Sequence, residues 1–178
     1  MATTKWVLDP SHSELSFKVK HLMVTNVSGS FNSFSVTAET TGDDFTNAVV
    51  AFSADATSIN TNSEQRDEHL KNADFFDAAN FPKITFKATG FQKKGSDEAY
   101  ELTGDLTIKD VTKSVKLNVE YGGLVKDPWG NNKAGFTVTG KINRKDFGLN
   151  WNTMLETGGV MVSEDVKINS EIQLIKQS

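Results

Sequence analysis

The polar side chains that could do chemistry gather in one stretch, residues 62–82, with the sequence NSEQRDEHLKNADFFDAANFP. Arg66 and His69 lie three positions apart, so they share a face if the stretch is helical, and Lys71 follows closely. One interpretation is a solvated helix surface, whose ion pairs contribute about 0–1 kcal/mol each. The other is a polar collar at the mouth of a cavity, where Arg66 binds a phosphate or a quinone oxygen. The residues leave both interpretations open.

The three histidines, His12, His21 and His69, do not form a metal-binding pattern. No two of them have the spacing of metal ligands, and the chain has no cysteine. We therefore expect no metal site, and the chain carries no motif for a cofactor. A group on the inner side of a sheet could still act in catalysis, and His21 and Glu164 are the candidates for such a position.

Asp9, Ser11, His12 and Ser13 lie together near the N-terminus and resemble the parts of a catalytic triad. Adjacent residues on a strand point to opposite faces, however, and no G-x-S-x-G motif is present. We interpret Asp9 and Ser13 as turn residues and expect His12 to hydrogen-bond nearby backbone. The sequence therefore predicts no catalytic residue.

The stretch from 62 to 82 has the sequence features of a helix. Asn62 is a candidate N-cap, and Gln65 stands at the capping-box position three residues later. Leu70 and Phe76 can face the same way, and Pro82 ends the pattern. The spacing predicts a helix within residues 62–79 that caps one end of a sheet structure.

The rest of the chain alternates apolar and polar residues with period two, which is typical of half-buried strands. The alternation slips by one residue at Asn32 and Ser33, which indicates a bulge. About eight long strands separated by polar turns predict an all-β protein, and long open edges would be prone to aggregation. We therefore expect one domain over residues 1–178, an eight-stranded antiparallel barrel with one helical insert.

Composition excludes several classes of protein. A net charge of −4 argues against a nucleic-acid surface. No apolar run approaches the roughly 20 residues of a membrane span, so we expect no integral membrane protein. The start MATTKWVLDP lacks the apolar segment of a signal peptide. We expect a cytoplasmic protein, or a periplasmic one if a leader has been removed.

Several short motifs, in order, cover nearly the whole chain. They include Trp6-x-x-Asp9-x-x-His12-Ser13, Arg66-Asp67-x-His69-Leu70, Asp74-Phe75-Phe76-Asp77, Phe81-Pro82-x-Ile84, Asp127-Pro128-Trp129-Gly130 and Arg144-x-Asp146-Phe147-Gly148. This set resembles the YceI-like family of lipocalin-like bacterial proteins that bind polyisoprenoids. The resemblance implies a closed barrel, an isoprenoid lipid as ligand, either a polyprenyl phosphate or an isoprenoid quinone, and a homodimer.

The inward faces of the strands mix large apolar residues with small ones. Gly104 and Gly140 in mid-strand would leave an apolar tunnel, or they mark bends at barrel corners, and the sequence leaves both open. Trp129 is expected to pack at a barrel end. The residues predicted to contact a ligand are Phe17, Val19, His21, Phe31, Phe34, Phe52, Arg66, Phe86, Leu102, Gly104, Phe136, Val138, Gly140, Phe147, Trp151 and Met154.

Three functions fit these features. The first is a carrier or store for a long apolar isoprenoid. The second is an enzyme that acts on such a lipid, for which the sequence offers no convincing set of residues. The third is a filled barrel that serves only as a protein-interaction module.

Overall fold

The segments that alternate apolar and polar residues form long antiparallel strands, which make up most of the chain. The computed structural model describes residues 3–22, 24–149 and 162–177. Its strands are β1 (Thr3–Leu8), β2 (Glu14–His21), β3 (Thr25–Phe31), β4 (Phe34–Thr41), β5 (Asp44–Asp55), β6 (Ile59–Asn60), β7 (Lys83–Lys94), β8 (Ser96–Ile108), β9 (Val111–Lys126), β10 (Asn132–Asn143) and β11 (Val162–Lys176). Short 3₁₀ turns are η1 (Pro10–His12), η2 (Ala56–Ser58) and η3 (Arg144–Phe147).

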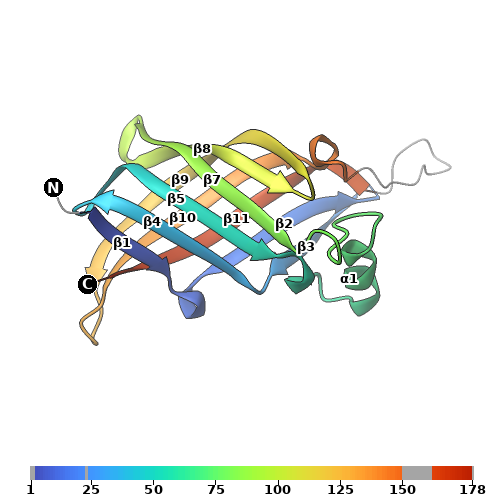
Figure 1. Cartoon of the computed structure of the whole chain (residues 1–178), viewed down its shortest axis with the longest axis horizontal. Coiled ribbons are helices and arrows are strands. Elements are labelled where there is room, and N and C mark those ends of the chain that lie inside the picture. Colours follow the sequence, from blue (N-terminus) through green and yellow to red (C-terminus); the bar gives the residue numbers. More distant parts are fainter. Residues whose placement is uncertain (1–2, 23, 150–161, 178) are drawn as a thin grey trace.

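These segments close into the predicted eight-stranded antiparallel barrel (Figure 1). Three wall strands are interrupted, so that β1 continues as β2, β4 as β3, and β5 as β6. The ring closes where β11 pairs with β1, for example Leu174 with Leu8, and β11 continues along β2. The break between β3 and β4 falls at Asn32 and Ser33, where the sequence pattern slips. Closure leaves little free strand edge along the barrel.

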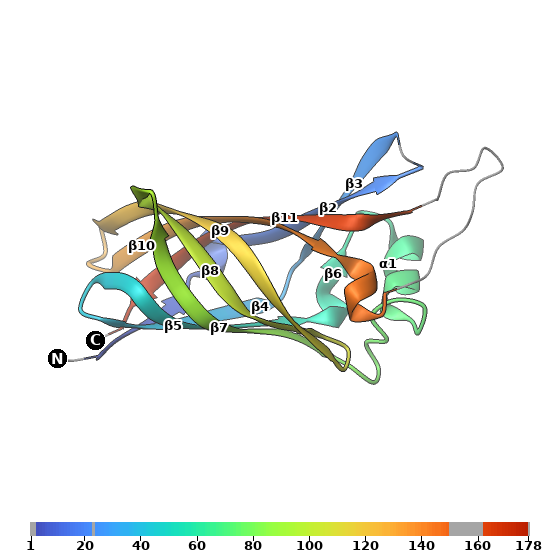
Figure 2. The ribbon, with the colours of Figure 1, turned by 90° about the horizontal axis from the view of Figure 1, so that it is seen from above.

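The helical insert is shorter than predicted and begins one residue later. Among the described residues, the α-helix α1 spans Glu64–Lys71. Its N-cap is Ser63, whose hydroxyl accepts from the backbone N–H of Arg66 at 3.3 Å. Asn62 has φ of +63°, so the capping box predicted there is wrong. Past Lys71 the chain forms turns up to β7 because Asn72 leaves helical geometry. The insert lies at one end of the barrel (Figures 1 and 2).

The end of the barrel farther from α1 is packed with aromatic side chains. The ring of Phe45 lies 4.9 Å from those of both Trp6 and Phe136, centroid to centroid. Phe91 and Tyr100 stack at 4.7 Å. The indole N–H of the buried Trp6 donates to Thr40 Oγ1 at 2.8 Å, which satisfies its polar atom. Trp129 takes no part in this packing: it is 81% exposed, so the expectation that it packs at a barrel end is wrong.

Glycines on the inner wall lie beneath large side chains of neighbouring strands. A Cβ on Gly104 would lie 2.4 Å from Cζ of Phe86 and 2.6 Å from the carbonyl oxygen of Lys87. A Cβ on Gly140 would lie 2.4 Å from Leu117 Cδ2. Of the two alternatives left open for Gly104 and Gly140, open lumen at these positions does not fit the structure, because neighbouring side chains already fill those places. The glycines instead let these side chains lie flat against the wall.

A buried ion pair fastens the bend between β1 and β2 to the start of β10. Lys133 Nζ lies 2.7 Å from Asp9 Oδ2 and 3.5 Å from Asp127 Oδ2. Asp9 also caps η1 by accepting from the N–H of Ser11, which confirms its predicted turn role. His12 Nδ1 bonds to the Asp9 carboxylate at 2.8 Å rather than to backbone, so that detail of the prediction is wrong. The hydrogen bond from Lys133 lowers the pKa of Asp9 well below its usual range.

Gly104→Ala is expected to lower the free energy of unfolding by about 1–3 kcal/mol, because the new methyl group overlaps Phe86 and fixed backbone. Gly90→Ala is the matched control on the adjacent strand, since nothing lies within 4 Å of its Cβ position. The control should change stability by no more than about 0.5–1 kcal/mol, in the favourable direction. Urea unfolding of both variants and of wild type measures these changes in the free energy of unfolding. Equal tolerance of alanine at the two positions would contradict the packing described for Gly104.

Asp9→Asn is expected to destabilise the protein at neutral pH and progressively less as the pH falls below about 4. The folded pKa of Asp9 lies below the unfolded value of about 3.9. Its contribution to stability is therefore present above about pH 4 and is lost as pH falls toward the folded pKa. Unfolding curves from pH 7 to pH 3 should show the difference from wild type shrinking below about pH 4. Asp165→Asn, in the exposed 3.7 Å pair with Lys141, should cost no more than about 1 kcal/mol. A pH-independent deficit in Asp9→Asn would refute this account.

Candidate ligand-binding cavity

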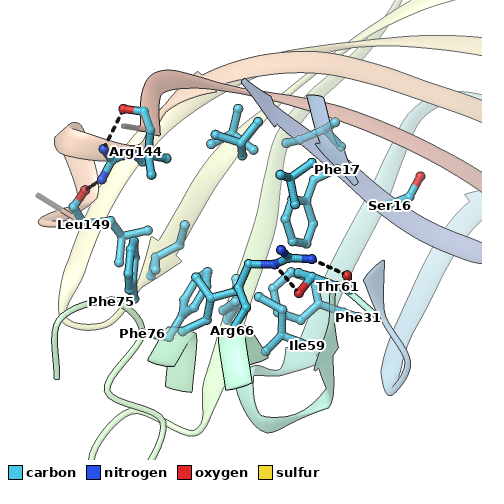
Figure 3. A pocket seen from close by; sticks show the side chains of 18 of the residues that line it. Ser16, Phe17, Phe31, Ile59, Thr61, Arg66, Phe75, Phe76, Arg144 and Leu149 are labelled. Atoms are coloured by element: carbon cyan, nitrogen blue, oxygen red, sulfur yellow. Dashed lines mark hydrogen bonds between the residues drawn. The ribbon is translucent and has the colours of Figure 1, made fainter. Parts of the chain in front are cut away.

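A cavity of about 560 Å³ occupies the half of the barrel nearest α1. Side chains from the strands form its wall and the insert covers its end (Figure 3). Its volume is within the range of ordinary small-molecule pockets, and most of its lining is apolar. The apolar lining includes Leu15, Phe17, Val19, Val27, Phe31, Phe52, Ile59, Leu70, Phe75, Phe76, Ile84, Leu106, Ile108, Ile142, Leu149, Val162, Val166 and Ile168.

A second cavity of about 150 Å³ lies deeper in the barrel, toward the aromatic end. Apart from Ser170, the described residues that line it are apolar, among them Phe45, Phe86 and Phe136. The two cavities meet at four shared side chains, Leu15, Phe52, Leu106 and Ile168, which we call the waist. The barrel therefore offers two apolar spaces in series rather than one round chamber.

The structure brings most of the predicted contact residues to these cavities. Phe17, Val19, His21, Phe31, Phe52 and Arg66 line the first cavity, and Phe52, Phe86, Leu102, Phe136 and Val138 line the second. Four others do not line either one. Phe34 packs beside Phe52 with ring centroids 6.2 Å apart, Phe147 is buried in η3, and Gly104 and Gly140 lie under neighbouring side chains. Trp151 and Met154 lie outside the described residues.

Arg66 stands where the first cavity reaches solvent. Its Nε donates to Thr61 Oγ1 at 2.7 Å, and its Nη2 donates to the Thr61 carbonyl at 2.6 Å. Thr61 Oγ1 in turn donates to Asp67 Oδ1 at 2.6 Å. Figure 3 shows the guanidinium reaching toward Thr61 among the rings of Phe17 and Phe31. Two of the five N–H donors are thus used for positioning, which leaves others for a ligand.

The polar lining of the first cavity is cationic or neutral. Lys20, His21, Arg66 and His69 surround its open end, which we call the mouth, and the described lining includes no aspartate or glutamate. His69 Nε2 lies 3.0 Å from Asp74 Oδ2. Lys71, grouped with Arg66 by sequence, does not line the cavity and instead lies 3.3 Å from Glu68. With low-dielectric walls, this lining favours a negative or electron-rich group.

Arg144 is a cavity residue that sequence reasoning missed. It is buried, and it donates to the carbonyl oxygens of Leu149 at 2.5 Å, Ser163 at 2.8 Å and Val162 at 3.2 Å. Burial lowers the pKa of its guanidinium. It therefore ties the end of η3 to β11 at the rim of the cavity. The signal was present in the motif Arg144-x-Asp146-Phe147-Gly148, but the local pattern does not reveal that the arginine is buried.

Glu164 was a candidate for a catalytic group on the inner side of the sheet, but it does not face the lumen. Its side chain is exposed and lies 2.9 Å from Lys145 Nζ.

Within residues 3–22, 24–149 and 162–177, no three histidine, cysteine or acidic side chains lie close enough to hold a metal ion. No helix in that part of the chain is long and apolar enough to cross a membrane.

A family model, sequence relatives and solved structures were each compared with this chain, and the three comparisons agree with one another. The model of the YceI-like domain family matches residues 6–174. A UPF0312 protein of Staphylococcus aureus strain N315 is 42% identical over 171 residues, which is 96% of each chain. The YceI protein of Campylobacter jejuni is 31% identical, with a TM-score of 0.77 over 90% of this chain and 91% of that one.

Two more distant structures share the fold. BcnA of Burkholderia cenocepacia is 20% identical with a TM-score of 0.80, covering 93% of this chain and 98% of that one. A polyisoprenoid-binding domain from Saccharophagus degradans is 16% identical with a TM-score of 0.66, covering 97% and 98%. The family model, the close relatives and the barrel together show that this chain belongs to the YceI-like family.

Proposed function

We propose that this protein binds one isoprenoid lipid in its barrel, a polyprenyl phosphate or an isoprenoid quinone, for storage or transport. The observation that carries the proposal is the distribution of polarity. The barrel holds two apolar cavities in series, and among the described residues charged side chains line the first cavity, at its mouth and at Arg144, but not the second. Such a space fits a ligand with a long apolar tail and one polar end.

The tail is expected to enter at the mouth and run past the waist into the second cavity. Burial of apolar area supplies roughly 25 cal/mol per Å², so a long chain in this lining gains a large driving force without specific polar contacts. A single flexible chain also suits two spaces that meet at the waist. The isoprenoid class is supported by the Saccharophagus degradans neighbour, which is described as a polyisoprenoid-binding domain.

The polar end of the ligand is expected at Arg66. Its guanidinium is already oriented by Thr61, so little side-chain freedom is lost when a ligand oxygen binds. Arginine can bind phosphate oxygens in a bidentate manner, and it also donates to carbonyl oxygens such as those of a quinone. We propose binding rather than catalysis: the described lining has no carboxylate, which leaves His21 and His69 as its imidazole groups without a lining carboxylate to act with.

Native mass spectrometry of the protein purified without detergent tests the proposal. We expect one lipid per chain, or uptake of one polyprenyl lipid when it is added to delipidated protein. Intact mass after organic extraction identifies the lipid. Failure of the delipidated, folded protein to take up any polyprenyl lipid would overturn the proposed function.

Arg66→Ala is expected to weaken binding of a polyprenyl pyrophosphate about tenfold or more relative to wild type, because a charge-assisted hydrogen bond is lost. Binding of the uncharged prenol with the same tail should change much less. Affinities from tryptophan fluorescence titration provide the comparison.

Lys71→Ala is the matched control for Arg66→Ala. It removes the same charge from the same helix but from a side chain that does not line the cavity. The control should bind both lipids as wild type does. Equal losses for the charged and the uncharged lipid in Arg66→Ala would remove Arg66 from head-group binding and assign it to positioning of the insert.

Val138→Phe is expected to separate long tails from short ones. Val138 lines only the second cavity, so a phenyl ring there fills space beyond the waist. Binding of a long polyprenyl chain should fall, whereas a short prenyl chain that fits in the first cavity should bind as before. Val27→Phe, in the first cavity, should weaken both.

Equal affinity of wild type and Val138→Phe for the long chain would place the tail elsewhere. Stability measured alongside separates two causes of lost binding. A filled void leaves the free energy of unfolding unchanged or higher, whereas overpacking lowers it by about 1–3 kcal/mol.

A further inference from the structure

The hairpin of β2 and β3 presents apolar side chains to solvent at its tip. It extends beyond the barrel wall at the end that carries α1 (Figure 2). Leu22 is 40% exposed and Val24 is 75% exposed. Leu22 also has φ of +53°, a region that favours glycine or asparagine in turns. An apolar residue is thus held at an exposed, strained turn position, where a polar residue would be the ordinary choice.

The charged side chains in residues 15–30, which form most of the hairpin, are all positive. Lys18 and Lys20 are exposed, and residues 15–30 include no aspartate or glutamate. The insert on the other side of the mouth is acidic. Its residues 63–81 contain five carboxylates against one arginine and one lysine. The end of the barrel is therefore polarised, with a cationic, apolar hairpin opposite an acidic helix.

The same hairpin is part of the cavity wall. Val19, His21 and Val27 line the first cavity, and Lys20 stands at its mouth. A surface bound by the hairpin tip would therefore lie directly beside the opening.

We propose that the β2–β3 hairpin docks on the surface of an anionic lipid bilayer, with Leu22 and Val24 in the interfacial layer and Lys18 and Lys20 at the headgroups. Exposed apolar side chains beside lysines are the combination that holds proteins at such surfaces. The acidic insert is repelled, so the molecule is oriented with its mouth beside the bilayer. Docking serves lipid transfer if the proposed function holds, but it is a separate property of the surface.

The other exposed apolar side chains lie mainly at the opposite end and provide a control. Leu124, Val125 and Trp129 are 40%, 65% and 81% exposed. Their end of the barrel is packed with aromatic rings, and the larger, first cavity lies at the other end. Docking there would hold the mouth of the first cavity away from the membrane.

Flotation with vesicles tests the proposal. Phosphatidylcholine vesicles with and without about 30% phosphatidylglycerol, a composition chosen to supply anionic charge, are mixed with full-length protein. The variants are Leu22→Ser with Val24→Ser, Lys18→Gln, and the control Val125→Ser with Trp129→Ser. Circular dichroism confirms that each variant is folded.

We expect wild type and the control to float with anionic vesicles and not with neutral ones. The hairpin double variant should lose binding roughly tenfold, and Lys18→Gln roughly fivefold. Absence of wild-type flotation on anionic vesicles, or an equal loss in the control, would overturn the proposal.

A second readout separates docking from ligand binding. Uptake of a fluorescent prenyl lipid is measured from ethanol solution and from anionic vesicles. Normal uptake of the hairpin variant from solution with slowed uptake from vesicles supports docking. No uptake by wild type from solution would overturn the proposed function, while flotation alone still decides whether the hairpin docks.

Discussion

The hollow interior depends on where the large side chains of the inner wall find room. Phe86 and Leu117 lie over Gly104 and Gly140 of neighbouring strands, and Phe17 lies over Gly29 in the same way. Because glycine has no side chain, each of these groups can lie flat against the wall rather than across the lumen. The bulk of these side chains is thus accommodated at the wall, by Phe17 in the first cavity and by Phe86 and Leu117 in the second, and apolar space remains in both.

The distribution of this space gives the molecule its polarity. At one end aromatic rings of Trp6, Phe45 and Phe136 pack together, and none of the described residues that line the second cavity is charged. At the other end the strand interruptions, α1 and η3 bring Arg66 and Arg144 to the rim of the first cavity. A ligand that matches both ends must be apolar over most of its length and polar at one tip.

Much of the fold could be predicted because strand alternation is a local signal. The closed barrel, the break at Asn32 and Ser33 and the presence of the insert all follow from patterns within a few residues. The roles of Gly104 and Gly140 could not be predicted, because what covers a glycine depends on the register of the neighbouring strand. Ser63 took the N-cap role expected of Asn62 because both residue types cap helices well.

The site could be predicted only in part, because the sequence shows which face of a strand a residue lies on but not which residues of other strands it meets. Inward residues such as Phe52 and Val138 could be assigned to a face, but not to one cavity or the other. Arg144 resembles a surface cation in the sequence, and its burial depends on carbonyl groups from residues 149, 162 and 163 that meet only in the folded barrel. Sequence patterns do not show such non-local acceptors.

The most direct measurement is a crystal structure with a prenyl lipid that carries bromine at the end of its tail. Anomalous scattering then locates the tail terminus without any assumption about the rest of the ligand. We predict one bromine peak beyond the waist, between Phe86 and Val138, with the polar end of the ligand at Arg66. A bromine peak at the mouth or on the outer surface of the barrel would contradict this account.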